Sequence, residues 1–427
     1  MHDFSSPLFG PLQGEPRQPV HSKCYARNLR RPQTAASPPA AEEIDLAKLY
    51  PKVRPPKSTP EVEFVHPSFE DGPAINALFN RVFHSDRSLA HHDWKYWRNP
   101  AGPPVGTFAR EIATDRCLAT GIGQRRRASV DGRDSCGALL CEVASDPESR
   151  GGGRLWREVM MGFSIDANDQ DGLHWAFGGQ STDDAIKVGE RWFGYRVILK
   201  LIPWEIRLGT RSSLRRRLGR WGSWLIPALA PIMDATLWRL WRKRDFGLNA
   251  TEVDKFNSDY DELWERYRHL YPVCFFRDSE TLNWRYVANP LWKHRIVEAR
   301  RDGRLLGYLV WREADQGGEK VATVLDFWHG DNQQVMQTLL DVARRKACVN
   351  QCVFLRFALQ EGGVEHQAFQ SFRSSRKSPY EEVDKIICTP IPGSKPMQQK
   401  PEVYELLRTV LSGKNWFYTQ GDCDFRD

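Results

Sequence analysis

A seven-residue phrase that occurs twice limits what this chain can fold into more than any other feature of its sequence. Residues 94–100 read WKYWRNP and residues 284–290 read WRYVANP, so both copies obey W-[KR]-Y-x-x-N-P without a gap. Trp94 and Trp284 are 190 residues apart, which is the length of a domain. A chain of 427 residues is also too long for one ordinary hydrophobic core. The sequence therefore predicts two domains with one plan.

The expected elements recur in the same order after each copy of the phrase. Each copy is followed by three strand-like runs separated by turn residues, then by a helix with apolar residues on one face, then by another strand. The expected strands are 105–113, 117–130 and 136–145 after the first copy, and 294–299, 305–313 and 320–329 after the second. Each set predicts an antiparallel meander, and the recurrence supports a duplicated fold.

Some segments fall outside this repeat. Residues 1–58 are rich in Pro, Ser, Ala and Gln and lack an apolar period, which predicts a disordered tail. Residues 211–246 are basic and rich in Trp, and they match nothing in the second copy. The predicted organisation is a disordered tail (1–58), a first module (59–202), a basic Trp-rich insert (203–250), a degenerate second module (251–390) and a C-terminal tail with a short helix (391–427).

The turn that ends the first meander carries the clearest chemical signal. A strand ends near Val143, Pro147 stops it, and residues 150–153 (RGGG) lead directly into a helix. Such a turn presents backbone N–H groups at a helix N-terminus, and glycine lets a ligand approach the backbone closely. A tight connection without a ligand is the alternative interpretation. The P-loop pattern is absent, and a preceding meander does not suit a dinucleotide-binding βαβ unit.

This turn follows a known pattern, V-x-x-x-P-x-x-R-G-x-G after the third strand of a meander. Val143, Pro147, Arg150, Gly151 and Gly153 match it. In these residues the sequence resembles the GNAT family of acyl-CoA-dependent N-acyltransferases, above all its long, two-module bacterial members in which W-[RK]-Y-x-x-N-P recurs. The resemblance implies an α+β fold in which each module is a mostly antiparallel mixed sheet flanked by helices. It also implies that acetyl-CoA or another acyl-CoA lies where the sheet splays between its fourth and fifth strands, with no metal.

The resemblance also assigns roles to single residues. Val143, Ala144 and Ser145 would bind the pantetheine arm like an added strand. The pyrophosphate would be held by Arg150, Gly151, Gly152, Gly153, Arg154 and Leu155. Leu155 departs from the small residue that is usual at its position. In the second copy the corresponding stretch reads LDFWHGDNQQVMQT, without such a loop, so we expect one acyl-CoA per chain, in the first module.

Catalytic groups are harder to assign. In the family's direct-attack mechanism a base deprotonates an amine, which then attacks the thioester. Glu142 is the candidate base, and an outward-facing glutamate without a catalytic role is the alternative. Glu190 or Trp192 occupies the region where the family often has an acid-donating Tyr, so no general acid is identified. Two other functions stay open: a catalytically inactive scaffold with this fold, and an aminoacyl-tRNA-dependent transferase of the peptidoglycan-bridge type.

Two charged clusters carry weaker signals. His91, His92 and Asp93 could ligate a metal, but a solvated helix surface is the favoured interpretation. Residues 125–127 (RRR) fit a charged strand end or turn, with contact to the 3′-phosphate of CoA as the alternative. We expect neither a bound metal nor a specific nucleic-acid partner.

The insert suggests a membrane contact. Its basic and Trp residues, with apolar runs too short to span a bilayer, suit peripheral contact with a membrane surface through residues 211–246. A helical hairpin packed between the modules is the alternative. Nine cysteines without ligand spacing argue against a disulfide or zinc framework. No run resembles a signal peptide or a spanning helix. We therefore expect a cytoplasmic protein, with membrane association as an open alternative, that acylates a small-molecule or polymeric amine.

Overall fold

The computed structural model describes residues 53–149, 152–179, 182–210, 214, 217–218, 222–240, 245–363, 365–366, 375–378, 383–394 and 400–423. The strands are β1 (Val62–Val65), β2 (Val105–Glu111), β3 (Arg116–Val130), β4 (Arg133–Ser145), β5 (Trp175–Gly178), β6 (Arg196–Arg207), β7 (Asn249–Val253), β8 (Val273–Phe275), β9 (His294–Arg301), β10 (Arg304–Gln316), β11 (Glu319–Trp328), β12 (Phe354–Gln360), β13 (Ser375–Lys377), β14 (Asp384–Pro390) and β15 (Trp416–Phe417). The helices are α2 (Gly72–Phe83), α3 (Leu89–Tyr96), α4 (Gly152–Ile165), α5 (Asp183–Phe193), α7 (Ile226–Leu240), α8 (Asp259–Tyr267), α9 (Ser279–Leu282), α10 (Gln333–Val349) and α12 (Pro401–Val410). Shorter helical turns used below are η3 (Ser223–Leu225) and η7 (Gln420–Asp422).

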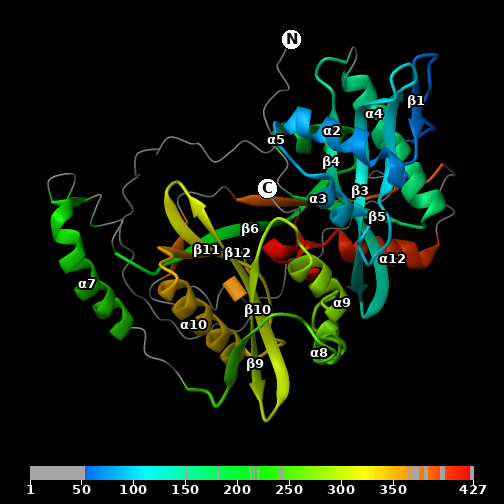
Figure 1. The fold of residues 1–427 in the computed structure, drawn as a ribbon. Helices are drawn as coiled ribbons and strands as arrows, with labels where there is room; N and C mark the ends of the chain where they lie inside the picture. The colour runs from blue at the N-terminus through cyan, green and yellow to red at the C-terminus, as the bar shows by residue number, and fades with distance from the viewer. Residues whose placement is uncertain are drawn as a thin grey trace.

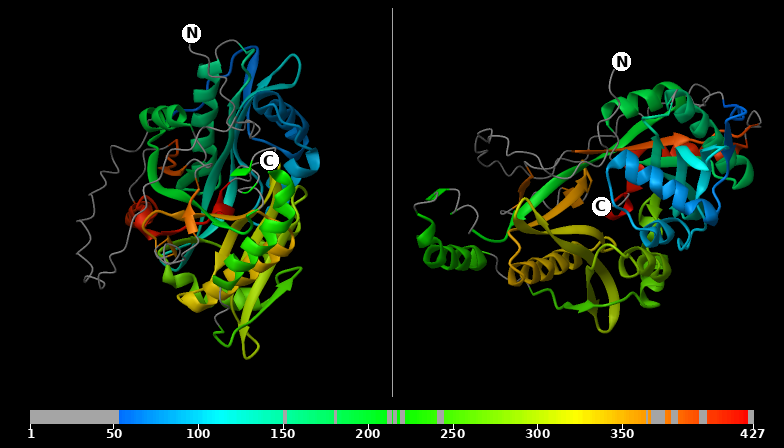
Figure 2. Two further views of the ribbon diagram at one scale, coloured as in Figure 1. Left: turned by 90° about the vertical axis from the view of Figure 1, so that its left-hand side faces the viewer. Right: turned by 45° about the horizontal axis from the view of Figure 1, so that its top comes forward.

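One continuous sheet runs through the molecule (Figures 1 and 2). Along it the strands follow the order β1-β2-β3-β4-β5-β14-β6-β12-β11-β10-β9-β7. Neighbours on this path are antiparallel except for the parallel pairs β4–β5 and β11–β12. The predicted α+β fold with a mostly antiparallel mixed sheet is confirmed. We call β1 to β6 (residues 62–207) the first half and β7 to β12 (residues 249–360) the second half.

In the first half, two pairs of helices cover opposite faces of the sheet. Helices α2 and α3 bury residues such as Ile75 and Leu78 on one face. Helices α4 and α5 cover the other face, where Met160 and Phe163 are buried. Helix α4 lies directly on β3 because Gly121 has no side chain: a Cβ there would be 2.8 Å from the carbonyl oxygen of Val159. The sheet is therefore enclosed in the region where the predicted site lies.

The second half repeats this order of elements. Helices α8 and α9 precede the meander β9-β10-β11, and α10 and the parallel strand β12 follow it. Helix α10 begins after Asn332, whose side chain accepts the backbone N–H groups of Gln334 and Val335. Val335 and Leu339 then pack into the core of this half, as their spacing predicts. The strands and helices expected after both copies of the phrase are present.

The two halves exchange their closing strands. Strand β6 follows β5 and α5 along the chain, and β14 follows β12. In the sheet, however, β14 lies between β5 and β6, and β6 lies between β14 and β12. Cys388 of β14 pairs with Phe177 of β5, and Trp204 of β6 pairs with Phe357 of β12. Each half is thus closed by a strand that the other part of the chain supplies.

The two copies of the repeated phrase meet between the halves. The indole N–H of Trp94 donates to the carbonyl of Trp284 at 2.8 Å, and the indole N–H of Trp284 donates to the carbonyl of Trp94 at 3.0 Å. Their rings stack with centroids 5.3 Å apart. Asn99 and Asn289 each accept backbone N–H groups of the turn that follows them. The phrase therefore joins the halves through reciprocal hydrogen bonds.

The ends of the described chain are bound to the body of the protein. Residues 1–52 of the predicted disordered tail lie outside the described residues. Arg54 forms an ion pair with Glu158 of α4, with one N–O distance of 2.7 Å, and the backbone N–H of Lys57 donates to the same carboxylate at 3.1 Å. Arg54 and Lys57, within the predicted disordered tail, thus contact α4. At the other end, the expected short helix is α12, and Trp416 and Phe417 after it are buried.

Candidate functional site

The sheet opens between β4 and β5. These parallel strands pair only at Ala138 with Ala176 and at Leu139 with Phe177. Strand β4 then continues to Ser145, and no strand within the described residues pairs with that edge of β4 beyond Leu139. The other edge of β5 is covered by β14. This is the fourth-to-fifth-strand opening that the sequence resemblance implies.

A β-bulge interrupts β4 beside this opening. The register between β3 and β4 shifts at Gly121, so that Glu142 and Val143 both lie opposite it. Glu142 has a φ of 59°, a left-handed conformation that is unfavourable for a residue with a Cβ. Because of the extra residue, Cys141 and Glu142 both contact α3, whereas Val143 packs with the core under α4 and α5. The bulge thus decides which side chains face each layer of helices.

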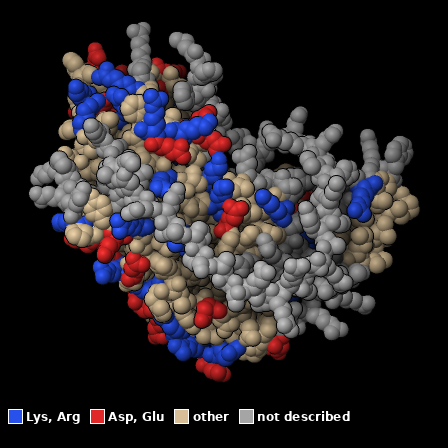
Figure 3. Space-filling model, turned by 180° about the vertical axis from the view of Figure 1, so that it is seen from behind, with Lys and Arg blue, Asp and Glu red and all other residues tan. Residues whose placement is uncertain are grey.

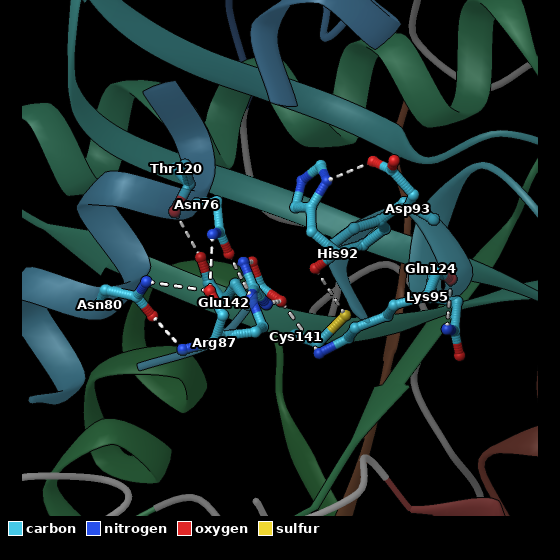
Figure 4. Close-up of polar contacts among 11 residues, drawn as sticks. Asn76, Asn80, Arg87, His92, Asp93, Lys95, Thr120, Gln124, Cys141 and Glu142 are labelled. Carbon is cyan, nitrogen blue, oxygen red and sulfur yellow. Dashed lines mark hydrogen bonds and ion pairs between the residues drawn. The ribbon is translucent and has the colours of Figure 1, made fainter. Parts of the chain in front are cut away.

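Glu142 lies in a buried ion-pair cluster (Figure 4). The guanidinium of Arg87 donates to both of its carboxylate oxygens, one of them at 3.1 Å. Lys95 Nζ lies 3.0 Å from Oε1 of the same carboxylate. Asn76 accepts the Nε–H of Arg87 at 2.6 Å, and the hydroxyl of Thr120 donates to the Glu142 carbonyl. The expectation of an outward-facing glutamate is therefore wrong, because this side chain faces the helices and is fully paired.

The cluster also makes Glu142 strongly acidic. Burial alone would raise the pKa of its carboxyl, but the positive charges of Arg87 and Lys95 outweigh that effect and hold the pKa well below its ordinary value. A general base works best when its pKa is near the operating pH. This geometry therefore counts against the general-base role, which stays a prediction.

The predicted phosphate loop lies only partly within the described residues. Arg150 and Gly151 are outside them. Helix α4 begins at Gly152, and a Cβ built on Gly153 would meet no atom within 4 Å. The start of α4 therefore has open space beside N–H groups that have no partner inside the helix. Leu155 is buried against Leu118, so its bulky side chain packs on the sheet.

A pocket of about 410 Å³ lies beside the start of α4. Arg154 and Leu155 line it, together with residues of β1, β2 and β3 and of the segment before β1. Its lining holds three basic and three acidic side chains, so it carries no net charge that would favour a phosphate. This pocket is distinct from the opening between β4 and β5.

The corresponding opening in the second half is filled by the C-terminal segment. The pairing of β11 with β12 ends at Val324, and η7 packs against both strands. Beside a bulge in β11, Asp326 binds Arg277 with an Nε–Oδ1 distance of 3.2 Å. Arg277 also binds Asp422 of η7 at 2.7 Å, and the hydroxyl of Thr419 donates to Asp326 at 3.0 Å. Among the described residues, η7 therefore occupies the edge of β11 that corresponds to the opening in the first half.

The two carboxylates of this cluster differ in acidity. Burial raises the pKa of Asp326, and the nearby Asp422 adds to that effect while Arg277 opposes it. Burial also acts on Asp422, but there the charges of Arg277 and Arg126 outweigh it and lower the pKa. A single arginine thus stabilises mainly one of two adjacent acids.

The two histidines in the predicted solvated surface are buried instead. His91 and His92 are each 2% exposed, so the expectation of a solvated helix surface is wrong. Burial, with the charges of Lys95 and Arg87, lowers the pKa of His91 to about 3. Among the described residues, no group of three or more His, Cys, Asp or Glu side chains is placed to hold a metal ion.

Residues 125–127 form ion pairs with three different parts of the chain: the first half, the C-terminal segment and the second half. They lie inside β3, not at its end. Arg126 is buried and faces Asp422 at 3.5 Å, and Arg127 binds Asp278 at 2.8 Å. Arg125 pairs with Asp171. The interpretation as a charged strand end or turn is therefore wrong.

Sequence reasoning missed the arginines that bind the buried acids. Arg87 and Arg277 are 190 residues apart, the spacing of the two tryptophans. The next residue caps a helix in both copies: Ser88 accepts the N–H of His91, and Asp278 accepts the N–H of Thr281. The repeat therefore extends seven residues before each tryptophan, and extending the alignment of the two copies backwards would have found it.

The candidates for a general acid give no support to that role. Glu190 and Trp192 are exposed on α5, where the guanidinium groups of Arg157 and Arg191 lie over the indole ring. Tyr195, just beyond the helix, is buried, and burial raises the pKa of its hydroxyl. No general acid is therefore assigned among the described residues.

Comparisons with known proteins agree with this geometry at the level of the fold. No protein-family model matches the sequence, and no similar sequence is found among curated proteins. A GCN5-related N-acetyltransferase from Anabaena variabilis ATCC 29413 is similar over 77% of this chain and 72% of its own, with 12% identity and a TM-score of 0.52. A probable N-acyltransferase from Enterococcus faecalis V583 is similar over 77% and 72%, with 10% identity and a TM-score of 0.53.

A third solved structure is the N-myristoyltransferase of Saccharomyces cerevisiae with bound myristoyl-CoA. It is similar over 85% of this chain and 90% of its own, with 8% identity and a TM-score of 0.50. At sequence identities this low, the structural similarity shows only that these proteins share a fold. The chain has the fold of the GCN5-related N-acetyltransferases, as its sequence resemblance implied.

Proposed function

We propose that this protein is an acyl-CoA-dependent N-acyltransferase that binds its acyl donor between β4 and β5. The observation that carries the proposal is the edge of β4 from Leu140 to Ser145, which no described strand pairs with and which leads toward the start of α4 at Gly152. A ligand with an extended, amide-containing arm can bind such an edge like an added strand. The fold neighbours, which include N-acetyltransferases and an enzyme solved with myristoyl-CoA, support a ligand of this class.

The residues at both ends of this edge suit the donor. Val143, Ala144 and Ser145 supply the backbone groups for the pantetheine arm. The first N–H groups of α4 lack acceptors within the helix and carry its positive dipole, which favours a pyrophosphate. Gly153 leaves room for that group, and the exposed side chain of Arg154 adds a positive charge.

The reaction that fits is direct transfer. The amine nitrogen forms a bond to the acyl carbon, the carbon–sulfur bond breaks, and the amine loses a proton while the CoA thiolate gains one. A bulge leaves its extra residue outside the ladder, so backbone N–H groups there can stabilise the oxyanion. We assign Glu142 a positioning role, because its ion pairs with Arg87 and Lys95 hold the left-handed bulge in place.

A catalytically inactive, acyl-CoA-binding scaffold is the second candidate function. The observation that favours it is the complete pairing of Glu142, which leaves the candidate base strongly acidic. The exposed positions of Glu190 and Trp192 on α5 point the same way. Both candidate functions require that acyl-CoA binds, but only the enzyme transfers the acyl group. A binding measurement and an activity measurement therefore separate the two candidates.

The first measurement is a calorimetric titration of the full-length protein with acetyl-CoA and with a long-chain acyl-CoA. We expect saturation at one equivalent per chain. Gly153→Val should weaken binding at least about tenfold, because its side chain would fill the space beside the first N–H groups of α4. Gly209→Val is the matched control, since a Cβ at Gly209 also meets no atom within 4 Å.

Unchanged affinity in the folded Gly153→Val variant would show that the donor does not bind at α4. Two equivalents of similar affinity would show that the second half binds as well. The second measurement is CoA release in the presence of small amines and amine-bearing polymers. Binding without release from any acceptor would favour the scaffold.

A further inference from the structure

Helix α7 stands apart from the sheet and exposes an apolar surface (Figure 1). Trp224, in η3 just before it, is 75% exposed, and Ile232 is 68% exposed. Leu229 and Met233 are also exposed. Leu229 precedes Ile232 by three residues and Met233 by four, and this spacing places the three side chains on one side of the helix. We call these four residues the α7 apolar face. Several large apolar side chains exposed together mark a contact surface.

The same helix is already held to the protein by other residues. Ile226 and Ala230 are buried with Leu214, and the hydroxyl of Thr210 lies 3.5 Å from the carbonyl of Ala230. Residues outside the α7 apolar face thus attach the helix to the protein. The alternative of a helical hairpin packed between the modules does not fit the position of α7, which lies at the edge of the molecule (Figures 1 and 2).

The charge of the chain is concentrated in the segment that contains this helix. Residues 211–246 hold nine Arg or Lys and two Asp, a net charge of +7. The whole chain has 61 basic and 54 acidic residues, so all other residues together hold 52 of each sign and carry no net charge. Of the basic residues in the segment, Arg217 is described and exposed. Uncharged atoms gather over α7 at the right-hand edge of Figure 3, with a basic side chain beside them.

We propose that the α7 apolar face docks on an anionic lipid surface. The helix would lie in the plane of the membrane, with Trp224 and Ile232 in the boundary between headgroups and acyl chains. The net positive charge of residues 211–246 would favour anionic headgroups. Amphipathic helices with basic and Trp residues bind in this way, and each basic residue near an anionic leaflet adds affinity. Among the described residues, none of the helices combines the length and the apolar character that a membrane span requires.

The test is co-flotation of the full-length protein with vesicles of phosphatidylcholine alone and of phosphatidylcholine mixed with phosphatidylglycerol. We expect binding to the anionic vesicles only, and weaker binding as salt is added. The variant Trp224→Glu/Ile232→Glu should lose at least about tenfold in partitioning, because it removes the inserted side chains and repels the surface. The matched control is Ile112→Glu/Val349→Glu, which places the same charges at exposed apolar residues elsewhere (53% and 72% exposed).

Each result decides the proposal. Equal binding by the two double variants, or no binding of the unmodified protein to anionic vesicles, would overturn it. Size-exclusion chromatography without lipid gives a further check. A dimer that dissociates in the Trp224→Glu/Ile232→Glu variant would show that the face contacts a second copy of this chain. Thermal unfolding of both variants should match the unmodified protein, since all four positions are exposed.

Discussion

The two halves place the same kind of buried pair beside the same strand, yet among the described residues only the first half leaves its sheet open. Glu142 binds Arg87 at the bulge of β4, and Asp326 binds Arg277 beside the bulge of β11. Beyond the bulge, the first half continues into a glycine turn, whereas the second half receives η7 and its Asp422. The arginine, the acid and the bulge therefore belong to the shared frame of the sheet. The two halves differ in what occupies the opening of the sheet, and we propose that this difference decides which half binds a donor.

The largest expected difference between the halves is in how much stability the protein loses when the buried arginine is replaced. Arg277→Met leaves Asp326 and Asp422 buried without their main cation, which should cost about 3–5 kcal/mol in the free energy of unfolding. Arg87→Met should cost less, because Lys95 stays 3.0 Å from Glu142. Urea unfolding followed by Trp fluorescence measures both. A larger loss for Arg87→Met would contradict this account of the two clusters.

If Arg277→Met does not accumulate as folded protein, limited proteolysis replaces the unfolding measurement. It compares Arg277→Met with the double variant Arg277→Met/Asp326→Asn. Removing the acid together with the arginine relieves part of the buried charge. We expect this double variant to resist proteolysis better than Arg277→Met alone. Equal sensitivity would mean that lost packing, and not the buried carboxylate, is the cause.

The tryptophans of the repeated phrase should behave alike, in contrast to the arginines. Trp94→Phe and Trp284→Phe each remove one indole donor and leave one buried carbonyl without it. Each should cost on the order of 1–3 kcal/mol. Because the rings also stack, the double variant should cost less than the sum of the two. Strict additivity in this cycle would show that the two hydrogen bonds are independent.

The smallest expected effect is an opposite pH dependence of the two acids. The pKa of Glu142 is lowered by folding, so its stabilisation is present above the unfolded pKa and is lost as the pH falls. The pKa of Asp326 is raised, so the folded protein takes up its proton first and gains stability as the pH falls through that value. Glu142→Gln should therefore make stability less sensitive to acid, and Asp326→Asn should make it more sensitive.

Unfolding free energies of both variants between neutral pH and about pH 4, where unfolded carboxyls titrate, test this contrast. Burial lowers the pKa of His91 and of His92, which destabilises the protein in acid in both variants. Because the charge of Glu142 raises both of these pKa values, Glu142→Gln adds to this loss and opposes part of the expected change. Changes of the same sign in the two variants would refute the assignment of the two pKa shifts.

The sequence predicted the helices and strands well, but it predicted the contacts between distant side chains poorly. Apolar periods report which face of a helix or strand is buried, so the meanders and α10 were placed correctly. A bulge leaves no mark in such a period, yet it turns Glu142 inward. The burial of His91 and the position of Arg126 depend on segments far away in the chain, and local patterns do not record these. The reciprocal bonds of Trp94 and Trp284 explain the repeat only once the two halves are seen together.

Because the halves exchange their closing strands, the first half cannot finish folding before the C-terminal strand β14 is available. One edge of β5 stays unpaired until residues 384–390 have been synthesised, so the first half is not complete when its own residues leave the ribosome. Pairing Phe177 with Cys388 closes a very long stretch of chain, which slows folding. Until then, the free strand edges can pair with other chains and aggregate. A chain that stops after residue 360 should therefore aggregate, and the donor site should form only near the end of synthesis.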